Sequence, residues 1–436
     1  MNTGLFLFTS DLRVQDNRAL FAAASYCQRL LLVYVIDPNE QKKQQYQCAK
    51  TGEHRQLFIQ QALHDLSEQL LTLDQHLIVQ VGEKAHVLNA LIREHNVDVV
   101  YYSSASDSQS QQQLLQLQQK IPMVSWNGIW QHTLYERHQL PFTLDDLPAS
   151  FSAFRRKLEK NLPAIAPPQQ LASLPPSPID SEQFEQVAGC FSGESLFDGG
   201  SRPGAMHLDA YFQSDLAQHY KETRNAIDDW AASTKFSPWI ANGCLSVRQI
   251  YSALRNHEIT HGSNESTYWI FFELLWREYF HWLALKIGDA LFNFTGTRDK
   301  KPLTSFHGER FVKWQQGATP YPLVNAIMHQ LRDTGFISNR ARQITASCLV
   351  NELCLDWRYG AAYFQQQLVD YDPAANWGNW QYIAGVGVDP RGGRHFNIEK
   401  QQQMFDADGE YVKRWQGEQS THPIDSVDIA DWPIAQ

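Results

Sequence analysis

The stretch YWIFFELLWREYFHWLALKI, residues 268–287, decides the fold of the second half of the chain. Fifteen of its 20 residues are apolar, which predicts a helix that is buried on most of its sides. Glu273, Arg277 and His281 interrupt it at intervals of four and share one stripe, with Trp276 beside them. Buried charges are costly unless they are paired or face a polar cavity. The stripe is therefore either an internal Glu273–Arg277 ion pair or a surface that faces a ligand.

The chain around this helix shows almost only helical periodicity from residue 205 onward. Predicted helices cover residues 205–218, 245–256, 268–287, 322–334, 339–356 and 359–370. Eleven of the 13 tryptophans lie from residue 230 onward, so the composition also changes along the chain. We therefore expect residues 205–436 to form an all-α second domain.

The first 135 residues alternate instead between short apolar runs and helical patterns. The runs predict strands over residues 4–9, 30–36, 77–81, 97–102 and 121–126, and the clearest helix covers residues 53–73. Strands that alternate with helices predict an α/β domain with a doubly wound parallel sheet. Residues 136–204, which are rich in proline and glycine, predict an extended connector between the two domains.

Composition excludes several classes of protein. The chain has 37 basic and 47 acidic residues, a net charge of −10, which argues against a binder held everywhere by phosphate attraction but permits a local basic patch. No apolar run reaches the ~20 residues of a membrane helix, and the N-terminus does not resemble a signal peptide. Six cysteines without a C-x-x-C pair predict reduced thiols, no metal site and a cytoplasmic location.

The segment TGFISNRARQ, residues 334–343, predicts the end of one helix and the start of another. Gly335 can end the first helix, and Ser338 or Asn339 can cap the second. Arg340 and Arg342 then fall in a first turn, where cations oppose the helix dipole. They are therefore either solvated or held there by an anion, which is a carboxylate, a phosphate or both.

Two further segments have unusual compositions. DYDPAANWGNWQY, residues 370–382, predicts a loop-like segment whose many rings favour a planar polar ligand over a metal. STKFS, residues 233–237, follows Tyr220 and suits either phosphate oxygens or ordinary helix caps. Trp357 and Trp380 are either core residues or steps in an electron-transfer path.

Together these segments resemble the photolyase/cryptochrome family, most closely its cryptochrome DASH branch. The resemblance rests on FTSDLRVQDNRAL (8–20), STKFSPWIANGCLS (233–246), FFELLWREYF (271–280), TGFISNRARQ (334–343) and DYDPAANWGNWQYIAGVGVDPR (370–391). It implies an N-terminal α/β domain with room for an antenna, a connector and a helical FAD-binding domain. This division agrees with residues 1–135, 136–204 and 205–436.

The resemblance also implies a U-shaped FAD between the helices. Arg342 would pair with Asp370 beside the flavin ring, and Asn376 would lie near flavin N5. Trp380 and Trp357 would be the first two steps of an electron-transfer chain from the surface. The implied cofactor-binding residues are Tyr220, Ser233, Thr234, Lys235, Phe236, Ser237, Glu273, Arg277, Asn339, Arg342, Asp370, Asp372 and Asn376.

The implied substrate is a cyclobutane pyrimidine dimer in DNA, which an electron from excited reduced flavin splits. Glu273 would hydrogen-bond the lesion and Trp276 would stack on it, while Asn339 and Arg340 would contact lesion or phosphate. Tyr382 stands where many duplex-acting photolyases have tryptophan. The smaller ring predicts weaker contact with a flipped dimer and hence a preference for single-stranded DNA.

Departures from the family pattern concern the antenna and the electron-transfer chain. Relatives that bind a 5,10-methenyltetrahydrofolate antenna often have glutamate near the position of Ala105, so a folate here would lack that partner. The outermost tryptophan of the electron chain is not evident, because TSFHGERF (304–311) contains Phe306 and no tryptophan.

The resemblance leaves more than one function open. The first is DNA repair by a deoxyribodipyrimidine photo-lyase type of enzyme, and the second is a blue-light photoreceptor that signals through flavin photoreduction. A third is a flavin- or nucleic-acid-binding protein without photochemistry. The joint presence of Glu273, Trp276, Asn339 and Arg340 favours repair, because a sensor does not need a lesion pocket.

Overall fold

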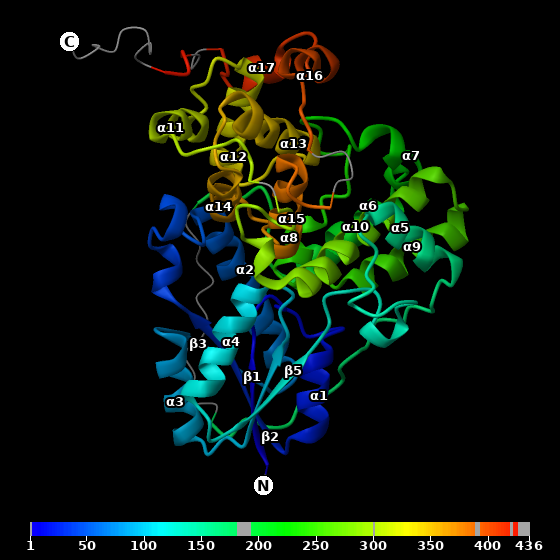
Figure 1. Cartoon of the computed structure of the whole chain (residues 1–436). Helices are drawn as coiled ribbons and strands as arrows, with labels where there is room; N and C mark the ends of the chain where they lie inside the picture. Colours follow the sequence, from blue (N-terminus) through cyan, green and yellow to red (C-terminus); the bar gives the residue numbers. More distant parts are fainter. Residues whose placement is uncertain (1, 181–192, 300, 389–392, 419–421, 426–436) are drawn as a thin grey trace, which may run out of the picture.

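The N-terminal part of the chain forms a five-stranded parallel sheet with helices on both faces (Figure 1). The computed structural model describes residues 2–180, 193–299, 301–388, 393–418 and 422–425. The strands lie in the order β3-β2-β1-β4-β5, so the order reverses between β1 and β4. Their bounds are β1 Thr3–Leu7, β2 Arg29–Ile36, β3 Leu77–Val81, β4 Val99–Ser103 and β5 Ser125–Ile129.

Alternate residues of the central strands face two different cores. Leu5 and Leu7 of β1 face the core covered by α3 (Lys84–Glu94) and α4 (Ser108–Lys120). Phe6 and Leu32 face the opposite core, which α1 (Arg18–Tyr26) and α2 (Glu53–Leu71) cover and which continues into the helical part. Burial on both faces explains the near-continuous apolar strands, and the predicted doubly wound sheet is confirmed.

Strand β5 begins four residues later in the chain than the apolar run over 121–126 predicts. Ile121 and Val124 are buried in the core beneath the sheet, before the strand begins. β5 pairs only with β4 and is the edge of the sheet, so it is only partly buried and needs no apolar run.

The described residues from Ser201 onward are mainly helical, with α10 at the centre between α7, α9 and α15. None of the described helices is long and apolar enough to cross a membrane. The helices are α6 Ser201–Gln213, α7 Leu216–Thr223, α8 Ser237–Ala241, α9 Val247–His261, α10 Glu265–Ile287, α11 Gly308–Gln316, α12 Pro322–Thr334, α13 Asn339–Ser347, α14 Trp357–Gln367, α15 Pro373–Ala384, α16 Ile398–Phe405 and α17 Glu410–Arg414.

The prediction of a loop-like segment over 370–382 was wrong, because α15 occupies most of it. Asp372 is the N-cap, and its side chain accepts a hydrogen bond from the backbone N–H of Ala375. Pro373 is the first helical residue, where its fixed φ favours a helix start. The Asp-Pro pair is thus a helix start, and the aromatic residues lie on a rigid element.

Two predicted helices end earlier than the periodicity indicates. The helix predicted over 205–218 breaks at Ser214, whose hydroxyl donates to the carbonyl of Tyr211 and so competes with the helical bonds. The helix predicted over 339–356 passes into a π-helical turn at Cys348–Glu352. The predicted end at Gly335 and the cap at Ser338 are both confirmed, with Gly335 at φ 68°.

The connector is less extended than its composition predicts. A helix, α5 (Phe151–Lys160), forms within it, because Ser150 caps its start and Phe151, Phe154 and Leu158 share a buried face. The first helix of the second part, α6, also begins four residues before the predicted boundary at 205. Residues 181–192 of the connector lie outside the described residues.

A buried ion pair ties the α/β part to the helical part. The guanidinium of Arg248 on α9 bonds Asp16 at 2.6 and 3.1 Å, and the two side chains are 4% and 0% exposed. The hydroxyl of Ser246 donates to the same carboxylate, and Arg13 donates to the carbonyl of Gly243. Both Arg13 and Asp16 belong to the segment 8–20, so that motif joins the two parts of the chain.

Candidate functional site

The polar stripe of α10 converges on Asp372 at the start of α15. Arg277 donates to a carboxylate oxygen of Asp372 at 3.2 Å and also to the backbone carbonyl of His132. His281 Nε2 lies 2.9 Å from the same oxygen of Asp372. Burial alone would raise the pKa of Asp372, but His281 and Arg277 together hold it well below its ordinary value. Asp372 is therefore ionised at neutral pH.

Two histidines stack beside this carboxylate. The rings of His132 and His281 are 5.7 Å apart and nearly parallel. Burial, with His281 beside it, lowers the pKa of His132 to about 3, and burial also lowers the pKa of His281. His132 is therefore neutral, and Arg277 is a permanent cation that faces Asp372. The Nδ1 atom of His281 is buried without a hydrogen-bond partner in the described part of the chain.

A buried ammonium lies in the segment 233–237. Lys235 Nζ bonds the Ser233 hydroxyl at 2.8 Å and the Asp229 carbonyl at 3.0 Å, and the residue is 8% exposed. Burial lowers the pKa of Lys235 to about 8, with nearby Asp229 opposing this shift. Since its bonded partners are neutral oxygens, this ammonium would be stabilised by an anion in the same space.

The other predicted residues of this segment have different surroundings. Tyr220 of α7 is buried, and the Thr234 carbonyl is bonded by His207. The ring of Phe236 packs among aromatic side chains, so only its backbone is available to a phosphate. Ser237 begins the short helix α8.

Arg342 and Asp370 form an ion pair between α13 and the loop before α15. One guanidinium nitrogen of Arg342 bonds both carboxylate oxygens of Asp370, at 3.0 and 2.8 Å. The Asp370 side chain is 2% exposed. The anion that holds this first-turn arginine is thus a carboxylate, and the guanidinium also lies over the ring of Phe336, as does the ammonium of Lys235.

Glu273 and Trp276 lie on one face of α10, one turn before Arg277 and His281. Glu273 accepts a hydrogen bond from Arg224 at 2.5 Å, so the alternative of an internal Glu273–Arg277 pair was wrong. Burial raises the pKa of Glu273, while Arg224 opposes the shift. The ring of Trp276 stacks on Phe151 at 3.8 Å and lies perpendicular to Tyr382 at 6.4 Å.

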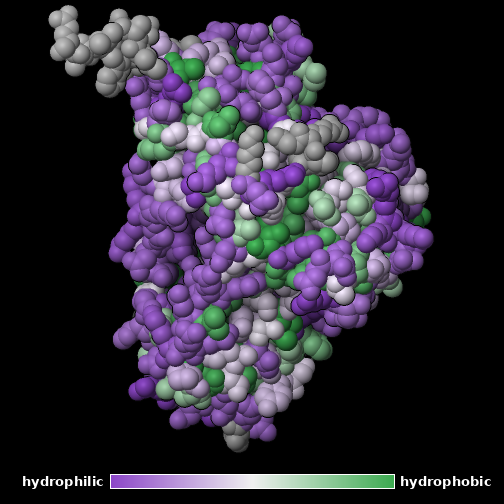
Figure 2. Space-filling model, viewed as in Figure 1, coloured by the Kyte–Doolittle hydropathy of each residue, from purple (hydrophilic) through white to green (hydrophobic). Residues whose placement is uncertain are grey.

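Several cations surround these residues. Arg340 donates to Asn225 at 3.2 Å, and its guanidinium lies 5.2 Å from the ring of Phe405, so it is not simply solvated. Arg394 bonds the hydroxyl of Tyr382. Asn339, the first residue of α13, is exposed. Hydrophobic surface gathers over the meeting of α10 and α15 on the face drawn in Figure 2.

Trp380, Trp357 and Asn376 come together where α14 packs on α15. The Trp380 ring lies against Gly360, where an added Cβ would meet it at 2.3 Å. Trp357 is three residues earlier on the same helix and therefore on nearly the same face. The Asn376 amide donates to the Ala361 carbonyl at 3.0 Å. Trp357 and Trp380 are 0% and 2% exposed.

Sequence reasoning missed four partners of these residues. Arg224 and Arg394 donate hydrogen bonds to Glu273 and Tyr382. His132 follows the last predicted strand, and Phe151 lies in the predicted connector. Only Phe151 had a usable signal, since Phe151, Phe154 and Leu158 follow helical spacing.

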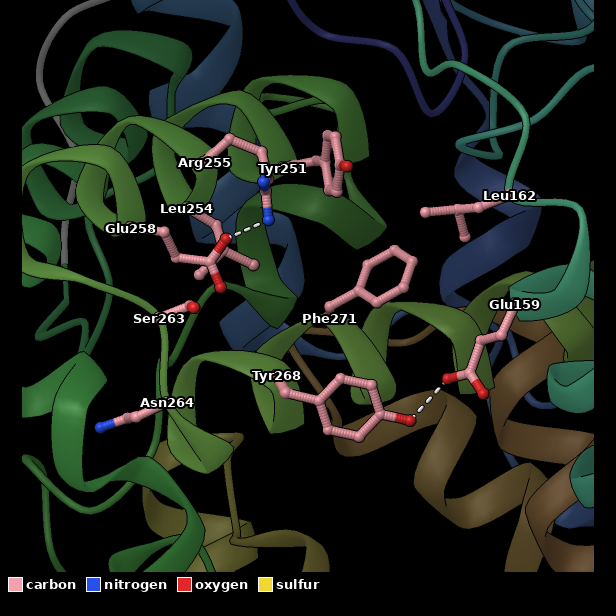
Figure 3. A pocket seen from close by; sticks show the side chains of 10 residues that line it. All are labelled: Glu159, Leu162, Tyr251, Leu254, Arg255, Glu258, Ser263, Asn264, Tyr268 and Phe271. Carbon is pink, nitrogen blue, oxygen red and sulfur yellow. Dashed lines mark hydrogen bonds and ion pairs between the residues drawn. The ribbon is translucent and has the colours of Figure 1, made fainter.

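Two cavities are lined mostly by other residues. The first, of about 400 Å³, lies between α9, the end of α5 and the first turns of α10, and Figure 3 shows Tyr268 and Phe271 on its α10 side. Phe271 and Glu273 are on roughly opposite faces of α10, so this cavity is separate from Glu273. The second, of about 920 Å³, lies at the carboxyl ends of β4 and β5 and is lined by Ala105, Trp130 and Trp282.

Comparison with known proteins places the chain in a family. Residues 269–433 match the FAD binding domain of DNA photolyase, and residues 4–175 match the family described as DNA photolyase. The Cryptochrome DASH of Idiomarina loihiensis is 50% identical over 99% of this chain and 96% of its own length. That of Vibrio parahaemolyticus is 46% identical over 99% and 97%.

Solved structures of proteins from this family have the same fold as this chain. The Synechocystis sp. cryptochrome has a TM-score of 0.89 and 38% identity, over 98% of this chain and 90% of that one. An archaeal photolyase from Sulfolobus tokodaii has a TM-score of 0.76 and 27% identity, over 95% and 90%. The fold and the flavin-related site define a photolyase-like flavoprotein. The chain belongs to the photolyase/cryptochrome family, in its cryptochrome DASH branch.

The residues present fit FAD, the cofactor of this family's helical domain. The buried ammonium of Lys235 has neutral partners and would be stabilised by a diphosphate. His281 Nδ1 is a buried polar atom that a ligand can satisfy. Arg342, paired with Asp370, and the ionised Asp372 supply fixed charges of both signs, which a polar ring system with both donors and acceptors requires.

Proposed function

We propose that this protein repairs cyclobutane pyrimidine dimers in DNA under blue light, preferentially in single-stranded DNA. The observation that carries the proposal is the grouping of Trp276, Tyr382 and Glu273 beside the flavin-related network of Arg277 and Asp372. An aromatic platform next to a carboxylate suits two linked pyrimidines, which offer apolar surface to a ring and N–H donors to a carboxylate.

Bound FAD supplies light-driven one-electron chemistry, which no amino-acid side chain provides by itself. Lys235 and Ser233 would hold the diphosphate, while Arg342, Asp370, Asp372 and Asn376 would orient the flavin. Other side chains of the protein hold the proposed lesion contacts in place. Phe151 fixes the Trp276 ring by stacking, and Arg224 fixes Glu273 by a hydrogen bond, so both lesion contacts are preorganised.

The proposed preference for single strands follows from Tyr382. Its hydroxyl is held by Arg394, so the ring is oriented by a polar contact and is smaller than an indole. Extracting a dimer from a duplex costs a few kcal/mol, whereas a single strand needs no unpairing. Weaker stacking at Tyr382 therefore penalises the duplex substrate most.

Repair of a thymine dimer in a short oligonucleotide tests the proposal. Protein with bound, chemically reduced FAD is mixed with the single-stranded or the duplex substrate and kept in blue light or in darkness. We expect repair only in light and faster repair of the single strand. Absence of repair from the lit single strand, with reduced FAD still bound, would instead favour the photoreceptor function.

FAD binding by this protein is expected to weaken as the pH rises above about 8. The Lys235 ammonium, whose pKa burial lowers to about 8, is present below that pH and lost above it, while a bound diphosphate would raise its pKa. The affinity should therefore fall by up to about tenfold per pH unit until the pKa of the complex is reached. Recovery of flavin fluorescence on release measures this. Lys235→Met should bind more weakly and lose the pH dependence, whereas Lys221→Met, at an exposed ion pair, should retain it.

Replacing Trp380 by Phe is expected to slow photoreduction of oxidised FAD while FAD stays bound. The phenyl ring is much harder to oxidise than the indole, yet it retains apolar contacts with Gly360 and Phe364. Absorption during blue illumination with a thiol gives the rate, and Trp415→Phe, a tryptophan bonded to Asp228 far along the chain, is the control. Equal rates for wild type and Trp380→Phe would remove Trp380 from the path.

Three further expectations are proposed with this function. The domain division is 1–135, 136–204 and 205–436, and the cytoplasm is the proposed compartment because the five described cysteines are free thiols. A 5,10-methenyltetrahydrofolate antenna would lie in the 920 Å³ cavity beside Ala105 and Trp130. Purified protein that carries it would absorb strongly near ~380 nm in addition to the flavin bands near ~450 nm.

A further inference from the structure

A run of aromatic rings leads from Trp357 to the protein surface. The ring centroid of Trp357 lies 5.7 Å from that of Trp377, and Trp377 lies 6.3 Å from Tyr46. Tyr46 in turn lies 5.1 Å from Tyr359. Burial decreases along the run, because Trp357 and Trp377 are buried whereas Tyr46 and Tyr359 are partly exposed.

The rings at the outer end of this run include no tryptophan. Phe306, from the segment that lacks the expected outer tryptophan, stacks on Tyr359 at 4.2 Å. A phenylalanine ring cannot reduce an oxidised indole, because it is much harder to oxidise. A phenol can do so if it loses its proton at the same time. The last oxidisable residues before solvent are therefore tyrosines.

We propose that Tyr46 is the surface electron donor of this protein and that Trp377 connects it to Trp357. This inference rests on the proposed function, because bound FAD in the excited oxidised state is the electron acceptor. One electron passes from Trp377 to oxidised Trp357, and one from Tyr46 to oxidised Trp377. Tyr46 releases its phenolic proton to water and becomes a neutral tyrosyl radical. A thiol then returns one electron and one proton to it, and two of the resulting thiyl radicals form a disulfide.

The loop that carries Tyr46 is fixed to α14. The backbone N–H groups of Ala49 and Gly52 bond the side chain and the carbonyl of Gln366, each at 2.9 Å. Tyr46 and Gln47 both have φ of 61°, a left-handed conformation that is unfavourable for residues with a side chain. Such conformations persist where the surroundings enforce them and are frequent at functional positions. The loop thus holds the Tyr46 ring against the rings of the helical part.

The charges around Tyr46 suit loss of its proton on oxidation. The guanidinium of Arg358 lies 5.5 Å from the centre of the Tyr46 ring and is tied to Asp356 by three hydrogen bonds. Burial raises the pKa of Tyr46, with Arg358 opposing, so the phenol is protonated before oxidation. A neighbouring cation disfavours a cationic radical and favours the neutral radical that forms when the phenol loses its proton.

A competing branch of rings stays inside the protein. Trp380 lies 6.2 Å from Trp314, and Trp314 lies 5.6 Å from Tyr363. Tyr363 is only 6% exposed, and its hydroxyl donates to the carbonyl of Gln315. A thiol reaches this ring less easily than Tyr46, so the Tyr363 branch is the matched control.

The test is electron paramagnetic resonance of the FAD-loaded, oxidised protein that is frozen during blue illumination. We expect a neutral tyrosyl signal in wild type, its loss in Tyr46→Phe and Trp377→Phe, and its retention in Tyr359→Phe and Tyr363→Phe. Photoreduction with dithiothreitol should slow in the first two variants. Tyr46→Trp should restore photoreduction and replace the tyrosyl signal by a tryptophanyl signal, which keeps the test decisive if Tyr46→Phe folds poorly.

A tyrosyl signal that survives in Tyr46→Phe, or that is lost in Tyr359→Phe or Tyr363→Phe alone, would overturn the assignment. The proposed repair function is tested separately in wild type reduced with dithionite in the dark, because chemical reduction bypasses the ring chain. Failure of that repair with an intact tyrosyl result would refute repair and leave Tyr46 as the donor.

Discussion

Replacing Asp16 by Asn is expected to lower the free energy of unfolding by about 3–5 kcal/mol, because it leaves the buried Arg248 guanidinium without its counter-charge. Asparagine has nearly the same shape as aspartate and keeps an acceptor oxygen. The loss of stability therefore measures the missing charge and not the effect of a cavity. The cost is large because both side chains are almost fully buried between the two parts of the chain. Urea denaturation of wild type and variant measures the change.

An exposed ion pair provides the control for Asp16. Glu265→Gln breaks the pair with Lys221 at the surface and should change stability by about 0.5 kcal/mol or less. The double variant Asp16→Asn/Arg248→Met should be more stable than the sum of the two single losses predicts, since it removes the unpaired charge as well. A loss for Asp16→Asn no larger than that of Glu265→Gln would show that the pair does not hold the two parts together.

Replacing Trp276 by Ala is expected to weaken binding of a dimer-containing single strand by about 5- to 150-fold, the effect of one lost stacking platform of about 1–3 kcal/mol. The structure favours a large effect because Phe151 already holds the ring in one orientation at 3.8 Å. Binding then loses little conformational entropy at the Trp276 side chain, because this side chain is already ordered. Fluorescence anisotropy of a labelled oligonucleotide in the dark gives the dissociation constant.

The control for Trp276 is a tryptophan of similar partial burial elsewhere. Trp126 in the edge strand β5 donates to the carbonyl of Ile121 and lies in the α/β part. Trp126→Ala should leave the affinity for the dimer unchanged. Comparable affinity of wild type and Trp276→Ala would exclude the indole as a platform for the lesion and would weaken the repair proposal with it.

Much of the fold follows from local rules. The buried helix α10 is evident from its fifteen apolar residues, and the boundary between α12 and α13 follows from Gly335 and Ser338, whose roles depend only on backbone conformation and one hydrogen bond. The sheet was predictable for the same reason, since buried parallel strands need apolar runs. β5 was misplaced because an edge strand needs none, and α15 was missed because Asp372 and Pro373 were interpreted as a loop.

The site was harder to predict because its contacts join distant segments. Glu273 and Arg224 are 49 residues apart, and Arg277 reaches a carbonyl 145 residues away. No spacing rule connects such positions, so local reasoning left Glu273 either with Arg277 or with a ligand. Only the family resemblance predicted the pair of Arg342 with Asp370. Nothing in the sequence predicted a role for Tyr46, because its ring approaches that of Trp377 only when its loop packs against α14.

The separation of Asp16 from Arg248 has a consequence for how the protein is made. During synthesis Asp16 leaves the ribosome 232 residues before its partner, so the sheet can begin to assemble while that carboxylate is still hydrated. Water is removed from it only when the helical half arrives and docks. If translation pauses before α9, the first half of the nascent chain can form strands while the Asp16 carboxylate is still unpaired and exposed. We expect chaperones to protect the chain in this state.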